Sequence, residues 1–237
     1  MIIVKWVMIL IKLTGIQGNI VYNDIDIDKN IRRSFEDCLQ DKYGELAINQ
    51  FGIPVEAPSE IPRILIVSQK FNFQLQISKN MLQVNVPFNL KVDENPVQYL
   101  QNTVDGMKTL LILFKEFKAE ILYVGVMANY VSNIDNGVNH ILSKCYNTDN
   151  LQDKDNIYDI MSRITYVEDD IYYKNMTIGN IRETISQNNL VGISYDVNDR
   201  YRYNSTKQIS ASKDDTLDKI LSIHKRFIDD DYGRLLE

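Results

Sequence analysis

The chain has 237 residues, of which 44% are hydrophobic and 24% are charged, and these values are typical of a globular protein that needs no disulfide or metal to fold. Its formal net charge of -6 argues against non-specific binding to nucleic acid or to an anionic membrane. Two cysteines, Cys38 and Cys145, are too few and too far apart for a disulfide framework or a zinc site. We therefore expect a protein of the reducing cytoplasm.

Residues 2–13 are nearly all apolar, but two lysines interrupt them and the segment is far shorter than the roughly 20 residues of a membrane helix. The residues that follow are a poor signal-peptide cleavage site. The segment predicts a long buried strand that runs on, with a bulge at Gly15 or Gly18, towards Tyr22.

A surface helix is predicted next. Asp28 can cap its first turn, and Ile31, Phe35 and Leu39 then recur at the spacing of a helix with one apolar stripe. Three prolines between residues 54 and 62 predict an extended connector after this helix.

Residues 61–117 carry the clearest pattern in the chain. Apolar and polar residues alternate in 71–77 and again in 82–86, which indicates antiparallel strands with one buried face. A helix follows, in which Asn95 is the expected N-cap, Pro96 the first helical residue and Gln98 the partner in a capping box.

The second half of the chain is predicted to repeat strands and helices. The final helix has Asp214 or Asp215 as its expected cap. In chain order the predicted elements are a strand at 120–131, a short helix at 136–146, a polar loop at 147–156, a helical turn and then a strand within 157–173, strands at 175–186 and 190–197, and a helix at 213–230.

These patterns predict a single α+β domain spanning residues 1–237, with a mainly antiparallel sheet and helices packed on one side. The order of strand, helix and antiparallel strands can be traced twice along the chain, so two similar lobes are an open alternative. The polar loop at 147–156 would then be the boundary between them.

Four acidic residues are the candidates for a metal-dependent nuclease or hydrolase. Glu168 and Asp170 could join Asp196 and Asp199 around a divalent cation if their strands were adjacent. Carboxylates of this kind more often belong to a solvated surface, so we expect neither a metal nor another cofactor.

Acid–base catalysis has few candidates, because the chain has only two histidines. His224 falls on the apolar stripe of the final helix, which favours a core position, and His140 lies in the short helix. No nucleophile elbow or phosphate-binding glycine loop is present in the sequence. We therefore expect no catalytic residues, and an enzyme is the less favoured alternative.

Tyrosines are concentrated in the last third of the chain. Tyr195, Tyr201 and Tyr203, together with Arg200, are residue types that anchor protein–protein contacts. The competing interpretation is that these rings pack along one face of a sheet, and the sequence leaves both open.

Several short fragments stand out along most of the chain. They are Pro62-Arg63-Ile64-Leu65 with Ser68, Leu75-Gln76-Ile77-Ser78, Asn129-Tyr130-Val131 with His140, Asp196-Val197-Asn198-Asp199-Arg200, and a closing helix with His224 and Phe227. In this order they resemble a sporadically distributed, uncharacterised family of bacterial and archaeal proteins, although the separation of Asn129-Tyr130-Val131 from His140 is wider here than in the family's pattern. The resemblance implies an accessory gene of mobile or defence regions, and it implies no activity.

The leading functional hypothesis is thus a non-catalytic accessory protein, such as an antitoxin-like or defence-system subunit, that binds another protein, with a basic partner favoured by the acidic composition. Self-association would fit as well. The alternatives are the metal-dependent nuclease or hydrolase and a structural component of a phage or virus. Binding to membrane or nucleic acid is not expected.

Overall fold

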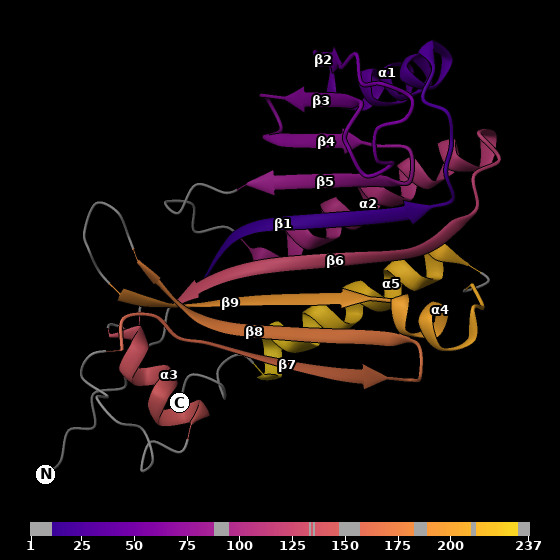
Figure 1. The fold of residues 1–237 in the computed structure, drawn as a ribbon. Helices are drawn as coiled ribbons and strands as arrows, with labels where there is room; N and C mark the ends of the chain where they lie inside the picture. Colours follow the sequence, from indigo (N-terminus) through magenta and orange to yellow (C-terminus); the bar gives the residue numbers. More distant parts are fainter. Residues whose placement is uncertain are drawn as a thin grey trace, which may run out of the picture.

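The computed structural model shows one continuous sheet of nine strands in the order β2-β3-β4-β5-β1-β6-β9-β8-β7, and every neighbouring pair is antiparallel (Figure 1). Helices complete an α+β fold, so the predicted fold class is confirmed. The structure describes residues 11–87, 95–132, 134, 136–146, 157–182, 189–209 and 212–231.

The strands fall into two groups along the chain. The first group is β1 (Ile11–Tyr22), β2 (Ala47–Gln50), β3 (Ile64–Ser68), β4 (Phe73–Ile77) and β5 (Met81–Pro87). The second group is β6 (Ile121–Ser132), β7 (Met161–Glu168), β8 (Tyr172–Arg182) and β9 (Asn189–Asn198).

Four of the five described helices occupy matching places in the two halves. The helices are α1 (Lys29–Tyr43), α2 (Pro96–Glu116), α3 (Gly137–Cys145), α4 (Arg200–Thr206) and α5 (Lys213–Arg226), and a π-helical segment, Phe227–Asp231, continues α5.

Both halves have the same connectivity. Each begins with a central strand, β1 or β6, continues through a helix to an outer strand, and returns strand by strand until the last one pairs with the first. A long helix, α2 or α5, closes each half. The change from one half to the next therefore falls between α2 and β6, whereas the expected boundary at 147–156 lies outside the described residues.

The helices α2 and α5 lie side by side on one face of the sheet, which is the rear face in the view of Figure 1. Gly18 on β1 allows this packing, because a Cβ atom there would collide with the side chain of Met107 on α2. The core fills the space between these two helices and the central strands.

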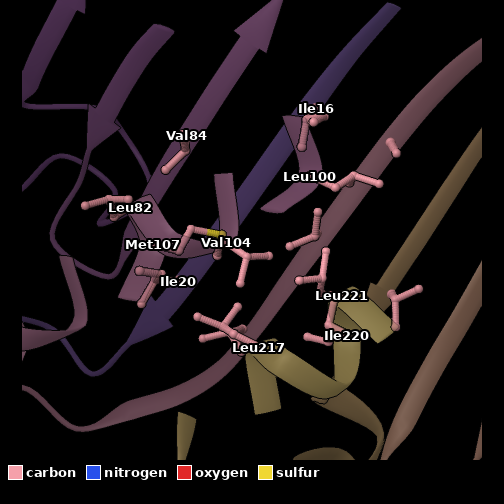
Figure 2. Close-up of a cluster of buried hydrophobic side chains, with 14 of the residues drawn as sticks. Ile16, Ile20, Leu82, Val84, Leu100, Val104, Met107, Leu217, Ile220 and Leu221 are labelled. Carbon is pink, nitrogen blue, oxygen red and sulfur yellow. The ribbon is translucent and has the colours of Figure 1, made fainter. Parts of the chain in front are cut away.

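Figure 2 shows this core, in which side chains of both helices converge on β1 and β5. Leu217 and Ile220 of α5 are fully buried, and burial of such a side chain stabilises the fold by roughly 1.5–3 kcal/mol. The other labelled members are Ile16, Ile20, Leu82, Val84, Leu100, Val104, Met107 and Leu221.

Strand register assigns every strand residue to one of two faces. Val126 and Val197 pair and are fully buried on the helix side, so their neighbours Met127 and Asp196, which also pair, project from the opposite side. We call the side without α2 and α5 the open face.

Local details correct some of the sequence predictions. Asp28 and Asn95 cap their helices as expected, but the side chain of Gln98 donates to Asn102, so no capping box forms. Ser212 caps α5 in place of the two aspartates. The bulge in β1 falls next to Gly15, between Leu13 and that glycine.

In the part of the chain that the structure describes, no helix combines the length and the apolar character that crossing a membrane requires.

Candidate interaction surface

The open face carries many uncharged polar side chains, together with apolar ones such as Leu65, Met127 and Val167. Gln17 pairs with Asn85, and Asn19 pairs with Gln83. Asn85 and Gln83 pair in turn with Gln74 and Gln76, so amide groups form two rows across β4, β5 and β1. Amides both donate and accept hydrogen bonds, which suits a surface that contacts another polar molecule. The amide and hydroxyl residues of this face are Gln17, Asn19, Asn49, Gln74, Gln76, Gln83, Asn85, Asn129, Thr165, Asn175, Thr177, Ser194 and Asn198.

Charge is distributed unequally between the two sides of the protein. Among the described strand residues of the open face, the charged ones are Lys12, Arg163 and Asp196. Exposed acids are instead frequent on the helix side, and they include Asp37, Asp41, Asp105, Glu116, Asp215 and Asp218. The acidic net charge of the chain is therefore not a property of its open face.

An aromatic cluster occupies the end of the open face where α4 folds against β6 and β8. We call the residues Tyr123, Tyr173, Arg200, Tyr201, Tyr203 and Lys207 the tyrosine patch. The ring of Tyr123 lies 6.3 Å from that of Tyr203, and the ring of Tyr173 meets that of Tyr201 edge-on at 5.2 Å. These rings are half-buried, so each keeps part of its surface available to a partner.

Two cations complete the tyrosine patch. The guanidinium of Arg200 lies 5.3 Å above the Tyr123 ring, and the ammonium of Lys207 lies 5.2 Å from the centre of the Tyr203 ring. Both residues are exposed. Among the described residues, neither cation forms an ion pair with a carboxylate, so the patch has a positive local charge.

Asp199 fixes the tyrosine patch in place. Its side chain is 1% exposed; one oxygen accepts the backbone N–H of Val124 at 2.7 Å, and the other meets Lys213 Nζ at 2.5 Å. Lys213 also donates to the carbonyl of Leu122 at 3.1 Å. The start of α4 is thus tied to β6 and to α5, which sets the position of Arg200.

Asp196 projects from the open face on β9, between Met127 of β6 and Asn175 of β8. It accepts hydrogen bonds from Asn175 at 2.9 Å and from Asn198 at 3.0 Å. Burial raises the pKa of this carboxyl, although the two hydrogen bonds and the charge of Arg163 oppose that shift. The structure therefore embeds Asp196 in the amide surface as a hydrogen-bond acceptor.

The four carboxylates considered for a metal do not converge. Asp196 projects from the open face, whereas Asp199 is buried on the helix side and paired with Lys213. Glu168 faces Lys174 and Arg226 at 2.8 Å, and Asp170 is exposed in the turn between β7 and β8. Within the described residues, no three His, Cys, Asp or Glu side chains gather as a metal would require.

Tyr195 lies in the core, which removes it from the expected interface. It is 5% exposed and stacks on Phe227 with ring centres 4.0 Å apart. The strand alternation explains this position, because Tyr195 follows Val191 and Ile193 on the helix side of β9. The other predicted contact residues, Arg200, Tyr201 and Tyr203, come together in the tyrosine patch.

The two histidines lie on different helices. His224 is fully buried on α5, where Nε2 lies 3.0 Å from the carbonyl of Val126, and burial lowers its pKa to about 4. His140 lies on α3, where burial again lowers the pKa of the imidazole. Neither lies in the tyrosine patch.

The predicted contact residues leave out three members of the tyrosine patch, Tyr123, Tyr173 and Lys207. Proximity in the chain groups the tyrosines of the last third, whereas the structure groups them by face and by strand pairing. Tyr173 pairs with Asn198 and Asn198 pairs with Gly125, which brings β6 and β8 to the same end of the sheet as α4. The signal available in the sequence was the alternation within each strand.

No protein-family profile matches the chain, and no curated protein matches it at a significant level. The resemblance to the sporadically distributed family therefore stays a prediction.

Proposed function

We propose that this chain is a non-catalytic accessory protein that binds another protein through its open face, with the tyrosine patch as the anchor. The observation that carries the proposal is the patch itself, in which half-buried tyrosines and exposed cations lie on a face that α2 and α5 leave uncovered. Tyrosine and arginine are the residue types in which binding energy concentrates at protein interfaces.

The surface chemistry selects the kind of partner. Arg200 and Lys207 are exposed, and Arg163 lies on the same face, so an acidic segment of the partner complements this surface. The amide rows then supply donors and acceptors for polar groups and backbone of that segment. A basic partner would instead meet the helix side, where the exposed acids lie.

A metal-dependent nuclease or hydrolase is not proposed, because its carboxylates lie on different faces and have other partners. Self-assembly, as in a structural component of a phage or virus, is a separate outcome that light scattering of the purified protein detects. A monomer leaves the open face available to a different protein.

The decisive experiment compares two charge-reversed proteins of equal net charge. Arg200→Glu combined with Lys207→Glu alters the tyrosine patch, and Lys29→Glu combined with Arg33→Glu alters exposed positions on α1. Tagged proteins are used to recover partners from the cells that produce the chain, after nuclease treatment, and the complex is rebuilt from purified components.

We expect wild-type protein and the α1 variant to bind one acidic protein at a fixed ratio, and the patch variant to lose it. Equal binding by both variants would place the interface elsewhere. Failure to recover any stoichiometric partner, together with a monomer by light scattering, would refute the proposed function.

A further inference from the structure

A second surface feature lies on the helix side, away from the open face. A pocket of about 470 Å³ opens between α1, α2 and strands β4 and β5. Its volume falls in the range of roughly 300–1,000 Å³ that small-molecule sites occupy. Buried apolar residues line its inner part, among them Leu75, Val84 and Leu110. We call it the α1–α2 pocket.

Aromatic rings form one wall of the α1–α2 pocket. The ring of Tyr43 meets Phe73 edge-on at 4.8 Å and Phe71 edge-on at 5.3 Å, and Phe71 at the mouth is 44% exposed. Rings that pack against one another in this way form a rigid apolar wall, so a flat molecule can contact it without a rearrangement of the wall's side chains.

A polar group is available inside this wall. Gly106 of α2 lines the pocket, and a Cβ atom at that position would lie 3.3 Å from the Tyr43 hydroxyl oxygen. The missing side chain lets the hydroxyl reach the wall formed by α2. A tyrosine hydroxyl both donates and accepts hydrogen bonds, so it offers a ligand in the pocket a polar partner.

Cations flank the mouth. Lys42 Nζ lies 5.4 Å from the Tyr43 ring centre and donates to Thr109 at 3.4 Å, and Lys70 Nζ lies 5.2 Å from the Phe71 ring centre. Asp105 is the acid among the described lining residues, and it accepts from Gln101 at 3.0 Å. Lys42 and Lys70 both lie against rings of the pocket wall, so an anionic group at the mouth would meet positive charge.

We propose that the α1–α2 pocket binds a small planar aromatic compound that carries one negative charge. The aromatic body lies against Phe73 and Tyr43, the Tyr43 hydroxyl donates to an acceptor on the ring system, and the anionic group stays at the mouth near Lys42 and Lys70. This site is independent of the proposed partner surface, because it lies on the other side of the sheet.

The test is a titration of the whole 237-residue chain with 8-anilinonaphthalene-1-sulfonate, an aromatic anion with a flat naphthalene body whose fluorescence rises on binding. Near-ultraviolet circular dichroism first establishes that each variant has native tertiary packing. We expect one saturable site in the wild-type protein. Gly106→Leu, which fills the pocket, should weaken binding by about tenfold or more, equivalent to ~1.4 kcal/mol.

Two further variants separate the pocket from general surface binding. Lys42→Met should weaken binding several-fold and reduce its dependence on salt. Gly52→Leu adds the same side chain at an exposed position with open space around it and should leave binding unchanged. Phe71→Ser, at the exposed mouth, replaces Gly106→Leu if that variant does not fold.

The proposal is overturned if wild-type protein shows no saturable site, or if folded pocket variants bind as tightly as Gly52→Leu. If the pocket binds the probe while no partner protein is recovered, the proposed function fails and the pocket proposal stands, because different residues carry the two proposals.

Discussion

His224 makes the stability of this protein sensitive to acid. The imidazole is fully buried beneath β6, its ring lies edge-on to Tyr195 at 5.3 Å, and burial holds its pKa at about 4 against an ordinary value of 6.5. In the unfolded chain the same side chain accepts a proton readily near neutral pH, whereas the folded protein resists it. Acid therefore stabilises the unfolded state selectively.

The magnitude follows from the difference between the two pKa values. A separation of roughly 2.5 units corresponds to ~3 kcal/mol, because each unit is worth about 1.4 kcal/mol. This stability is present above a pH of about 6.5, falls as the pH drops below that value, and is lost when the folded pKa is reached. Between about pH 7 and pH 5 the loss is ~2 kcal/mol.

The assay measures the free energy of unfolding in urea for wild-type protein and for His224→Gln. Glutamine cannot titrate, but its amide keeps a donor near the carbonyl of Val126. The wild-type protein should lose about 2 kcal/mol more than the variant between about pH 7 and pH 5. Equal losses in the two proteins would show that His224 does not titrate as a buried group.

Two carboxyl groups also change the free energy of unfolding with pH. Burial raises the pKa of Asp196, so the folded protein binds a proton at this residue more readily than the unfolded chain does. As the pH falls, this contribution increases the free energy of unfolding, which is opposite to the effect of His224. Burial also works to raise the pKa of Glu168, but hydrogen bonds and charges of Lys174 and Arg226 lower it overall, so its contribution is lost only at lower pH. The comparison with His224→Gln cancels both contributions.

Two further predictions concern the framework. Asp199→Ala removes one partner of a buried ion pair and leaves the charge of Lys213 without its carboxylate. The free energy of unfolding in urea should fall by ~3–5 kcal/mol, and a fall below ~1 kcal/mol would contradict the assigned role. Gly137→Ala places a Cβ atom 2.5 Å from the carbonyl oxygen of Leu190, so it should cost ~1–3 kcal/mol in the same assay, while Gly52→Ala, which meets no neighbour, serves as the control.

Local signals in the sequence predicted some elements well. The helix α2 begins where Asn95 and Pro96 indicate, and the alternation of 71–77 and 82–86 predicted β4 and β5. Capping and alternation act over a few residues, so they can be read without knowing the rest of the fold.

Features that depend on distant pairing could not be predicted in the same way. The strand β2 is four residues long and has little alternation to identify it, and α4 is a short helix held by contacts of Asp199 with β6 and α5. The position of Tyr195 could have been predicted. It alternates with Ser194 and Asp196 along β9, so it shares the face of the apolar residue Val197.

The pairing of β1 with β6 joins the two halves through the longest ladder of the sheet, from Ile11 opposite Ser132 to Tyr22 opposite Ile121. Cutting the chain between α2 and β6 would leave each fragment with a twelve-residue edge strand, in which the backbone donors and acceptors that faced the other half have lost their partners. Such fragments would tend to aggregate, so truncation is a poor way to map binding, and point substitutions in the intact chain are the suitable tool.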